Sequence, residues 1–320
     1  MLFAIIKFYA RLAIQIYCRK IIINKPEMLL MKGPVLFAAN HPNSFLDGII
    51  LTTLLKGNLY SLARGDAFKN KKVEKLLRWM HLLPVYRTSE GVENLSHNYT
   101  TFAACHQVFE KNGLVMIFSE GRCINEWHLR PLKKGTARLA ISAWQQGIPL
   151  TVLPVGFNYN TFRNFGKNVV INFGEPLDPT AVLQQQSEGK LLLAFNDQLE
   201  KQLQTLVLLI DPADQKELKE KLYVPQPFLK VVLLAVPAVL GWLLHAPLYY
   251  PVKAITQKYF DNDHFDSVVA SLLMLLYPIY LLLFCLAGLA LYNWQLLVLI
   301  LILLPFTAWC CVQLKNQLDS

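Results

Sequence analysis

The sequence predicts an α/β domain, with a mixed sheet covered by helices, joined to a C-terminal α-helical transmembrane region. Between residues 35 and 208, short apolar runs alternate with helical stretches, which is the pattern of strands separated by helices. Residues 267–314 carry no formal charge. Of the 320 residues, 54% are hydrophobic and only 17% are charged, against about 25% in an average soluble domain.

Six apolar runs are expected to form the strands of the sheet. They are Val35–Ala39, Leu59–Ala63, Leu83–Tyr86, Leu114–Phe118, Leu150–Val155 and Val169–Phe173. Five helical stretches separate or follow them, and these are Ser44–Leu55, Lys71–Met80, Val92–Lys111, Gly135–Gln146 and Leu191–Leu208. Short strands alternating with longer helices indicate a sheet with helices packed on its faces.

Composition divides the chain into four segments. Residues 1–24 are expected to be an interfacial amphipathic helix, 25–210 the α/β domain, 211–230 a connector, and 231–320 a membrane domain of two or three hydrophobic helices. The connector combines an Asp-Pro pair with several lysines and two prolines, a composition typical of a segment between folded parts.

The membrane domain contains enough apolar sequence for a helical hairpin, expected at about 269–291 and 295–314, because about 20 apolar residues cross the hydrocarbon of a bilayer. Two buried helices of a soluble protein are the alternative. Residues 231–252 form a third apolar stretch, whose prolines leave open whether it crosses bent or dips in and returns. Lys216, Lys219, Lys221 and Lys230 precede it and predict a cytoplasmic position for the α/β domain.

The first eighteen residues are apolar but interrupted by Lys7 and Arg11. No small-residue cleavage site follows, so a signal peptide is not expected. A helix lying in the membrane interface, with its cations toward the headgroups, fits this pattern. An amphipathic helix buried in the core is the alternative.

Positive charge is concentrated before the membrane domain. The whole chain has a formal charge of +9, but the segment from residue 231 onward contributes more acidic than basic residues. A basic domain favours anionic partners such as membrane lipids, phosphorylated substrates or acidic carriers. No nucleic-acid partner is expected, because the chain has no Arg-rich helix and no aromatic RNA-binding signature. The six cysteines show no metal-type spacing, so neither a zinc site nor a disulfide framework is predicted.

The first candidate site follows the strand predicted at 35–39. His41 should lie at the carboxyl edge of the sheet, where α/β proteins place ligands. Pro42 disfavours helix at His41, while Ser44 can cap the N-terminus of the next helix, with Asp47 three positions later. If the loop folds the imidazole over that first turn, Asp47 accepts from one ring nitrogen and the other nitrogen can take a proton from a hydroxyl group. The alternative is a structural turn in which Asp47 only favours the helix N-terminus.

Three further polar clusters are candidates to bind an anion at the same edge. They are Glu120, Gly121 and Arg122 after the fourth strand, Arg87 after the third, and Lys133 and Lys134 before a helix. Glycine allows close backbone approach, arginine binds phosphate through two parallel hydrogen bonds, and a helix N-terminus favours anions. Ile117 stands where a Gly-x-Ser-x-Gly nucleophile turn needs glycine, which excludes that role for Ser119. Ordinary surface loops with exposed cations are the alternative for each cluster.

In this order the clusters resemble the glycerolipid acyltransferase superfamily of PlsC-type 1-acylglycerol-3-phosphate and glycerol-3-phosphate acyltransferases. The family's blocks are Asn-His-x4-Asp, an arginine after a short strand, Phe-Pro-Glu-Gly-Thr-Arg, and a Val/Ile-Pro-Val strand. The matching positions are Asn40, His41 and Asp47; Arg87; Phe118–Cys123; and Val152–Val155. This sequence departs from the pattern in three ways. First, five residues separate His41 from Asp47, a spacing found in a subset of the family that includes fungal-type glycerol-3-phosphate acyltransferases. Second, Ser119 replaces the proline of the third block. Third, the arginine of that block comes one position early, at Arg122.

The resemblance implies a membrane-bound enzyme of phospholipid biosynthesis. It would transfer an acyl group from acyl-CoA or acyl-carrier protein to a hydroxyl of lysophosphatidic acid or glycerol-3-phosphate. The resemblance implies that His41 is the general base and that Asp47 orients its ring. Arg87 and Arg122 would bind the acceptor phosphate, with Lys133 and Lys134 further out. Glu120 would position the acceptor or the loop, and backbone N–H groups near Gly121 would stabilise the tetrahedral oxyanion. No metal or redox cofactor is implied. Another lysolipid or amino-lipid acceptor, or a non-catalytic lipid-binding membrane protein, are the alternatives.

Overall fold

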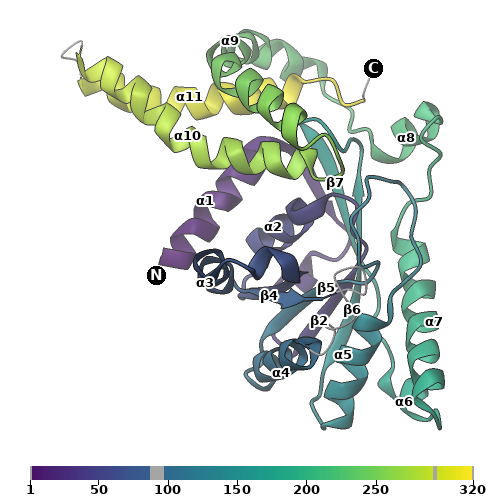
Figure 1. The fold of residues 1–320 in the computed structure, drawn as a ribbon. Helices are drawn as coiled ribbons and strands as arrows, with labels where there is room; N and C mark the ends of the chain where they lie inside the picture. Colours follow the sequence, from purple (N-terminus) through teal and green to yellow (C-terminus); the bar gives the residue numbers. More distant parts are fainter. Residues whose placement is uncertain (1, 87–96, 291–293, 319–320) are drawn as a thin grey trace.

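The α/β domain is built on one seven-stranded sheet with the strand order β1-β7-β6-β2-β5-β3-β4. This computed structural model describes residues 2–86, 97–290 and 294–318 (Figure 1). The strands are β1 (Cys18–Ile23), β2 (Val35–Ala39), β3 (Leu59–Arg64), β4 (Leu82–Val85), β5 (Leu114–Phe118), β6 (Thr151–Tyr159) and β7 (Lys167–Phe173). Neighbouring strands are parallel except β6 and β7, which are antiparallel. The predicted mixed sheet is therefore confirmed.

Helices cover both faces of the sheet. One face carries α1 (Leu2–Tyr17) and α2 (Ser44–Leu54), and the other carries α4 (His97–Glu110), α5 (Lys134–Gln145) and α7 (Glu188–Leu206) (Figure 1). The shorter helices are α3 (Lys71–Trp79), α6 (Pro179–Leu183) and α8 (Gln215–Leu222), with 3-10 turns η1 (Pro26–Leu30) and η2 (Gly65–Phe68). Successive strand side chains point to opposite faces, so the domain has two apolar cores.

The central strand β2 shows why the sequence located this domain well. It lies between β6 and β5, and all five of its residues are at most 1% exposed. Leu36 and Ala38 pack into one core, whereas Val35 and Phe37 pack into the other. A strand buried on both faces is an uninterrupted apolar run, and such a run can be recognised without alternation.

The edge strand β1 was not predicted. Residues 18–23 were assigned to the N-terminal helix, but α1 ends at Tyr17 and the chain continues as a strand parallel to β7. The consecutive isoleucines Ile21, Ile22 and Ile23 are β-branched and favour an extended backbone. Their partners, around Val169 and Ile171, lie far along the chain, so the pairing is invisible to local sequence patterns.

The N-terminal helix α1 is not confirmed as amphipathic. Ala10, Ile14 and Tyr17 are buried against the domain, while apolar residues such as Phe8 are exposed on the outer side. Lys7 Nζ donates to the backbone oxygens of residues 55 and 57 at 2.8 and 2.7 Å, and so this cation points toward the domain rather than away from it.

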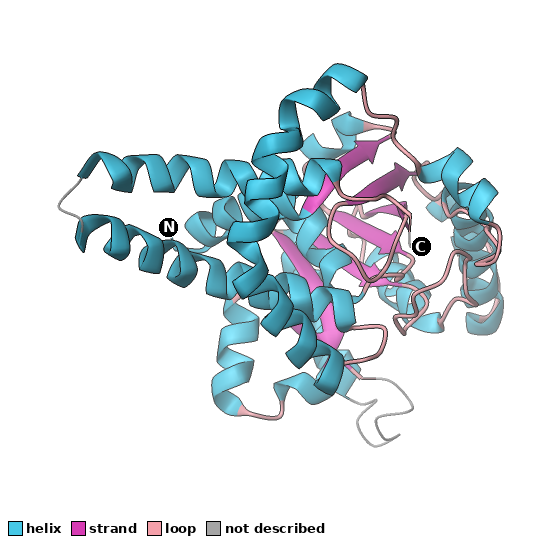
Figure 2. Ribbon diagram, turned by 90° about the horizontal axis from the view of Figure 1, so that it is seen from above, coloured by secondary structure: helices cyan, strands magenta, loops and turns pink. Residues whose placement is uncertain are grey.

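Three helices follow the α/β domain, α9 (Phe228–Tyr259), α10 (Phe265–Ala290) and α11 (Trp294–Leu314). Each is long and apolar enough to cross a membrane. Figure 2 shows α10 and α11 projecting together away from the sheet. The expected connector at 211–230 is partly helical, because it contains α8 and the start of α9. Leu218 and Leu222 of α8 are buried against Ile210.

The prolines of the third apolar stretch do not interrupt its helix, α9. It is one continuous helix of 32 residues that includes Pro237, Pro247 and Pro251. Neighbouring helices can support a helix that contains proline. Gly241 allows the closest approach of α9 to α11, because a Cβ there would lie 2.0 Å from the Thr307 carbonyl oxygen. The third apolar segment is therefore part of one helix that is long and apolar enough to cross a membrane.

Candidate active site

The loop between β2 and α2 brings an imidazole and a carboxylate into contact. His41 Nδ1 lies 3.0 Å from Asp47 Oδ2. The Asp47 side chain is fully buried, whereas 17% of the His41 side chain is exposed. A buried carboxylate at Nδ1 favours the tautomer that has its proton there, which leaves Nε2 as an acceptor.

The Asp47 carboxylate is fixed by two further donors. The backbone N–H of Asn43 donates to Oδ2 at 3.0 Å, and the Tyr159 hydroxyl donates to Oδ1 at 2.6 Å. Burial raises the pKa of Tyr159 well above its usual value, and the adjacent Asp47 raises it further, so the phenol stays a donor. Tyr159 was missed in the sequence because β6 continues past its predicted end at Val155 and carries this side chain to the edge of the sheet.

The position of the His41 ring is set by packing and by Asn40. The ring stacks on Phe118 at the end of β5, with centroids 3.6 Å apart and planes at 14°. The Asn40 side chain donates to Phe157 O at 3.0 Å and accepts from Phe157 N at 2.7 Å, and these bonds tie the loop to β6. The imidazole is therefore held between the ends of two strands.

Ser44 accommodates the five-residue spacing between His41 and Asp47. It has φ +51°, in the left-handed region that non-glycine residues rarely occupy. Two contacts hold this turn, because Ser44 N donates to Cys123 Sγ at 2.9 Å and Ser44 Oγ lies 2.7 Å from His264 Nδ1. Strained backbone of this kind persists where its surroundings enforce it, often at functional sites.

Glu120 joins two loops at the same edge. Its Oε2 accepts from the backbone N–H of His41 at 2.7 Å, and its Oε1 accepts from that of Arg130 at 2.8 Å. The residue is 5% exposed, and burial raises the pKa of its carboxyl, while the two backbone bonds act in the opposite direction. Glu120 thus ties the His41 loop to the segment at Arg130, with one carboxylate oxygen on each.

Glu120→Gln is expected to destabilise the fold by about 2 kcal/mol. It should also lower, about tenfold, the kcat of a reaction in which the His41 imidazole takes part. An amide offers only one acceptor oxygen, so one of the two backbone N–H groups would face an NH2 group and lose its bond. Steady-state kinetics and thermal unfolding would measure the two effects. Glu126→Gln, at a partly exposed carboxylate, is the matched control and should leave both quantities unchanged. Wild-type behaviour of the Glu120→Gln protein would contradict this positioning role.

The predicted anion-binding residues are only partly assembled. Gly121 has φ +68°, and a Cβ there would lie 2.9 Å from Lys133 Cγ, so the Lys133 stem lies against this turn. The Gly121 N–H donates to Phe118 O at 3.1 Å and is occupied within the turn. Arg122, Lys133 and Lys134 are exposed. Arg87 lies outside the described residues.

The first turn of α10 packs directly onto the His41 loop. Ser267 Oγ donates to Asn43 O at 2.8 Å and accepts from Leu46 N at 3.1 Å. Asp266 Oδ2 accepts from Asn43 Nδ2 at 2.8 Å and also pairs with Lys167. The sequence did not predict these contacts, because they join positions about 100 to 220 residues apart. A membrane-type helix therefore forms part of the wall of the site.

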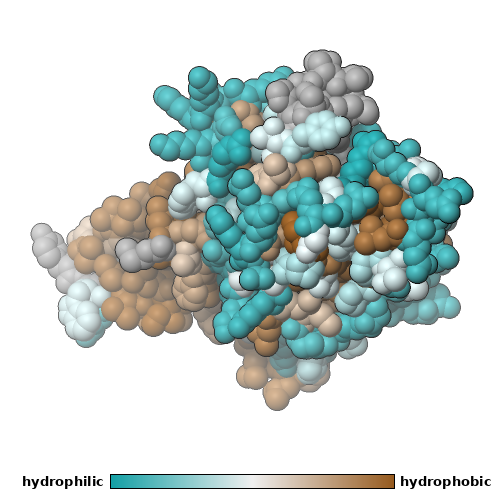
Figure 3. Space-filling view, turned by 90° about the horizontal axis from the view of Figure 1, so that it is seen from below, coloured by the Kyte–Doolittle hydropathy of each residue, from teal (hydrophilic) through white to brown (hydrophobic). Residues whose placement is uncertain are grey.

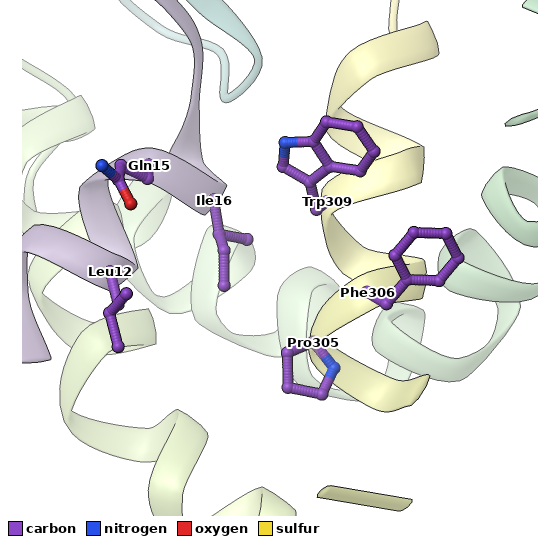
Figure 4. A pocket seen from close by; sticks show the side chains of 6 residues that line it. All are labelled: Leu12, Gln15, Ile16, Pro305, Phe306 and Trp309. Carbon is purple, nitrogen blue, oxygen red and sulfur yellow. The ribbon is translucent and has the colours of Figure 1, made fainter. Parts of the chain in front are cut away.

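Two cavities lie elsewhere. The larger, about 560 Å³, lies between α1 and α11, and is mostly apolar (Figure 4). Its lining residues are Leu12, Gln15, Ile16, Pro305, Phe306 and Trp309. The smaller, about 140 Å³, lies beside β4 and α4. Neither is lined by His41 or Asp47. Within residues 2–86, 97–290 and 294–318, no cluster of three or more His, Cys, Asp or Glu side chains could hold a metal ion.

Comparison with known proteins identifies the α/β domain. Residues 20–158, from β1 to the end of β6, match the family model described as Acyltransferase. The α/β domain therefore contains an Acyltransferase family domain, and the match covers less than half of the chain. A segment of 78 residues of this chain is 32% identical to Glycerol-3-phosphate O-acyltransferase 1 of Saccharomyces cerevisiae. That segment is 23% of this chain and only 10% of the yeast protein.

The fold was also compared with solved structures. This chain aligns with the crystal structure of the 1-acyl-sn-glycerophosphate (LPA) acyltransferase PlsC from Thermotoga maritima. The alignment has a TM-score of 0.40 and 14% sequence identity, and it covers 62% of this chain and 77% of the PlsC chain.

Proposed function

We propose that this protein is a membrane-bound O-acyltransferase of phospholipid biosynthesis. The donor is an acyl thioester, acyl-CoA or acyl-carrier protein, and the acceptor is glycerol-3-phosphate or lysophosphatidic acid. The observation that carries the proposal is the contact between His41 Nδ1 and the buried Asp47 carboxylate, 3.0 Å apart, inside an acyltransferase domain. The similarity to the yeast glycerol-3-phosphate acyltransferase supports the choice of acceptor.

In the proposed mechanism His41 is a general base. Nε2 removes the proton of the acceptor hydroxyl while its oxygen forms a bond to the thioester carbonyl carbon, whose π electrons move onto the carbonyl oxygen. Asp47 stabilises the imidazolium that results. Collapse of the tetrahedral intermediate re-forms the carbonyl and breaks the C–S bond, and the sulfur takes the proton back from the imidazolium. A thiol with a pKa of about 8.5 is a good leaving group, so no acyl-enzyme and no cofactor is needed.

The acceptor phosphate would be bound by cations at the same edge of the sheet. Arg87 and Arg122 are the proposed ligands, with Lys133 and Lys134 further out. Lys133 lies against the Gly121 turn, and Glu120 holds the neighbouring backbone of His41, so the proposed phosphate and hydroxyl positions are adjacent. Three lysines before α9 and a fourth in its first turn support a cytoplasmic position for this domain, where acyl thioesters are available.

A side-by-side assay would test the proposed function. The purified protein in lipid nanodiscs is offered glycerol-3-phosphate and 1-acylglycerol-3-phosphate, each with acyl-CoA and with acyl-carrier protein. Acylation of one of these acceptors is expected. Acylation of other lysolipids or amino lipids alone would replace the acceptor, and no transfer to any lipid would overturn the enzymatic proposal.

Arg87→Ala is expected to raise the KM for a phosphorylated acceptor about 10- to 100-fold, because hydrogen bonds to a charged group contribute about 1.5–3 kcal/mol. The KM for the acyl donor should stay within about twofold. Lys201→Ala, at an exposed cation of α7, is the matched control. A selective loss of donor affinity in the Arg87→Ala protein would show that the phosphate role is wrong.

A further inference from the structure

Helix α3 has an exposed apolar face. Val73, Leu76 and Met80 are spaced three and four residues apart, so they share one side of the helix, and Trp79 lies beside them. These four side chains are between 38% and 53% exposed. No residue of α3 is buried. An apolar face of this kind on a basic helix marks a surface that meets a partner.

The other side of α3 is strongly basic. Residues 69–80 hold five cations and one carboxylate, and that carboxylate, Glu74, pairs with Arg78 at 2.8 Å. The lysines on and before the helix are all exposed, and these are Lys69, Lys71, Lys72 and Lys75. An apolar face bordered by lysines is typical of helices that lie in the headgroup region of an anionic bilayer.

The apolar face of α3 continues onto α1. The Phe3 ring contacts the Trp79 ring edge-on, with centroids 6.2 Å apart. Helix α1 exposes Leu2, Ile5 and Phe8, and Tyr9 OH donates to Met274 O of α10 at 2.6 Å. Figure 1 shows α1 running from the membrane-type helices to α3, and Figure 3 shows the hydrophobic surface concentrated on one side of the molecule.

We propose that α3 docks the α/β domain onto an anionic phospholipid bilayer. Its apolar face enters the boundary between headgroups and acyl chains, and its lysines bind lipid phosphates. Charge complementarity and continuity with α1 and α10 favour a bilayer over a protein partner. Because α3 leads directly into β4, docking would hold the start of β4 near the membrane surface. The inference rests on the membrane-type helices and not on the proposed enzymatic function.

Lipid quenching of a probe on α3 tests this docking. The full chain carrying Leu76→Cys is labelled with an environment-sensitive fluorophore and placed in nanodiscs containing lipid spin-labelled near the headgroup. Five of the six native cysteines are buried, so they should take up little label. The signal of the labelled unsubstituted chain is subtracted as background. In phosphatidylglycerol-containing nanodiscs the label should be quenched at least threefold. Gln204→Cys on α7, which covers the opposite face of the sheet, is the control site and should show little quenching.

The charge contribution is tested by replacing three lysines together. Each lysine near an anionic surface strengthens binding about fivefold, so Lys71→Gln/Lys72→Gln/Lys75→Gln should weaken docking about 100-fold. Quenching at position 76 should then fall to its level in pure phosphatidylcholine. An unquenched label in anionic nanodiscs would overturn the proposal, and so would quenching that is equal in both lipids and unaffected by the triple substitution. Cross-linking of two chains through the introduced cysteine, without quenching, would assign the face to a second copy instead.

Discussion

His41→Ala is expected to lower the rate of acyl transfer by about 1,000-fold or more while leaving the fold and membrane insertion intact. A positioned general base contributes about 100- to 10,000-fold, and alanine cannot take the hydroxyl proton. The side chain is partly exposed and lies at the edge of the sheet, so its removal leaves the two cores untouched. Single-turnover acylation in nanodiscs measures the rate, and circular dichroism with carbonate extraction checks folding and insertion.

Two variants sharpen this test. Asp47→Asn should cause a loss of similar size, because an amide next to Nδ1 no longer favours the productive tautomer. His128→Ala removes an exposed histidine that pairs with Glu126, and it should retain normal turnover. Full activity of the His41→Ala protein would show that the imidazole is not the base, and the enzymatic mechanism would have to be abandoned.

Asp266→Asn is expected to destabilise the protein by about 3–5 kcal/mol. Asp266 is 1% exposed and pairs with Lys167, which is fully buried, and it also accepts from Tyr17 OH at 2.5 Å. Replacing the carboxylate leaves the lysine charged and unpaired in a dry environment, which is the costly half of a broken buried ion pair. Denaturant unfolding in detergent micelles, followed by tryptophan fluorescence, measures the change in free energy.

A second substitution should rescue most of this loss. In Asp266→Asn/Lys167→Met neither member of this pair carries a charge, and the new amide can donate to Asn43 Oδ1, a buried acceptor that has no partner in the described structure. We expect the double variant to recover more than half of the lost stability. If it is as unstable as the single variant, the ion pair is not the source of the effect.

The first turn of α10 connects a membrane-type helix to the candidate active site. Asp266 and Ser267 lie in this turn, and both form hydrogen bonds to residues between His41 and Asp47. A shift of α10 relative to the domain would therefore move the loop that holds the proposed base, His41, because hydrogen bonds join the two. Lowered activity is expected for Asp266→Asn even at temperatures where the protein stays folded.

Much of the domain could be predicted from local sequence alone. β2 and β5 were placed with their observed bounds, because strands buried on both faces are apolar throughout. The contact between His41 and Asp47 was also expected, since both residues belong to one short loop and the first turn of the following helix. The resemblance to acyltransferases rests on these same residues, and the family match confirms it.

The sequence by itself determined the alternation of strands and helices and the apolar character of the C-terminal segment, and it placed His41 and Asp47 close enough along the chain to meet. Tertiary structure alone decided that β1 joins β7, that Tyr159 fixes Asp47, and that α10 closes the site through Asp266 and Lys167. The physical reason is separation along the chain. Elements and local loops follow from the periodicity and chemistry of neighbouring residues, whereas these contacts join positions between about 100 and 250 residues apart and exist only once the sheet has formed.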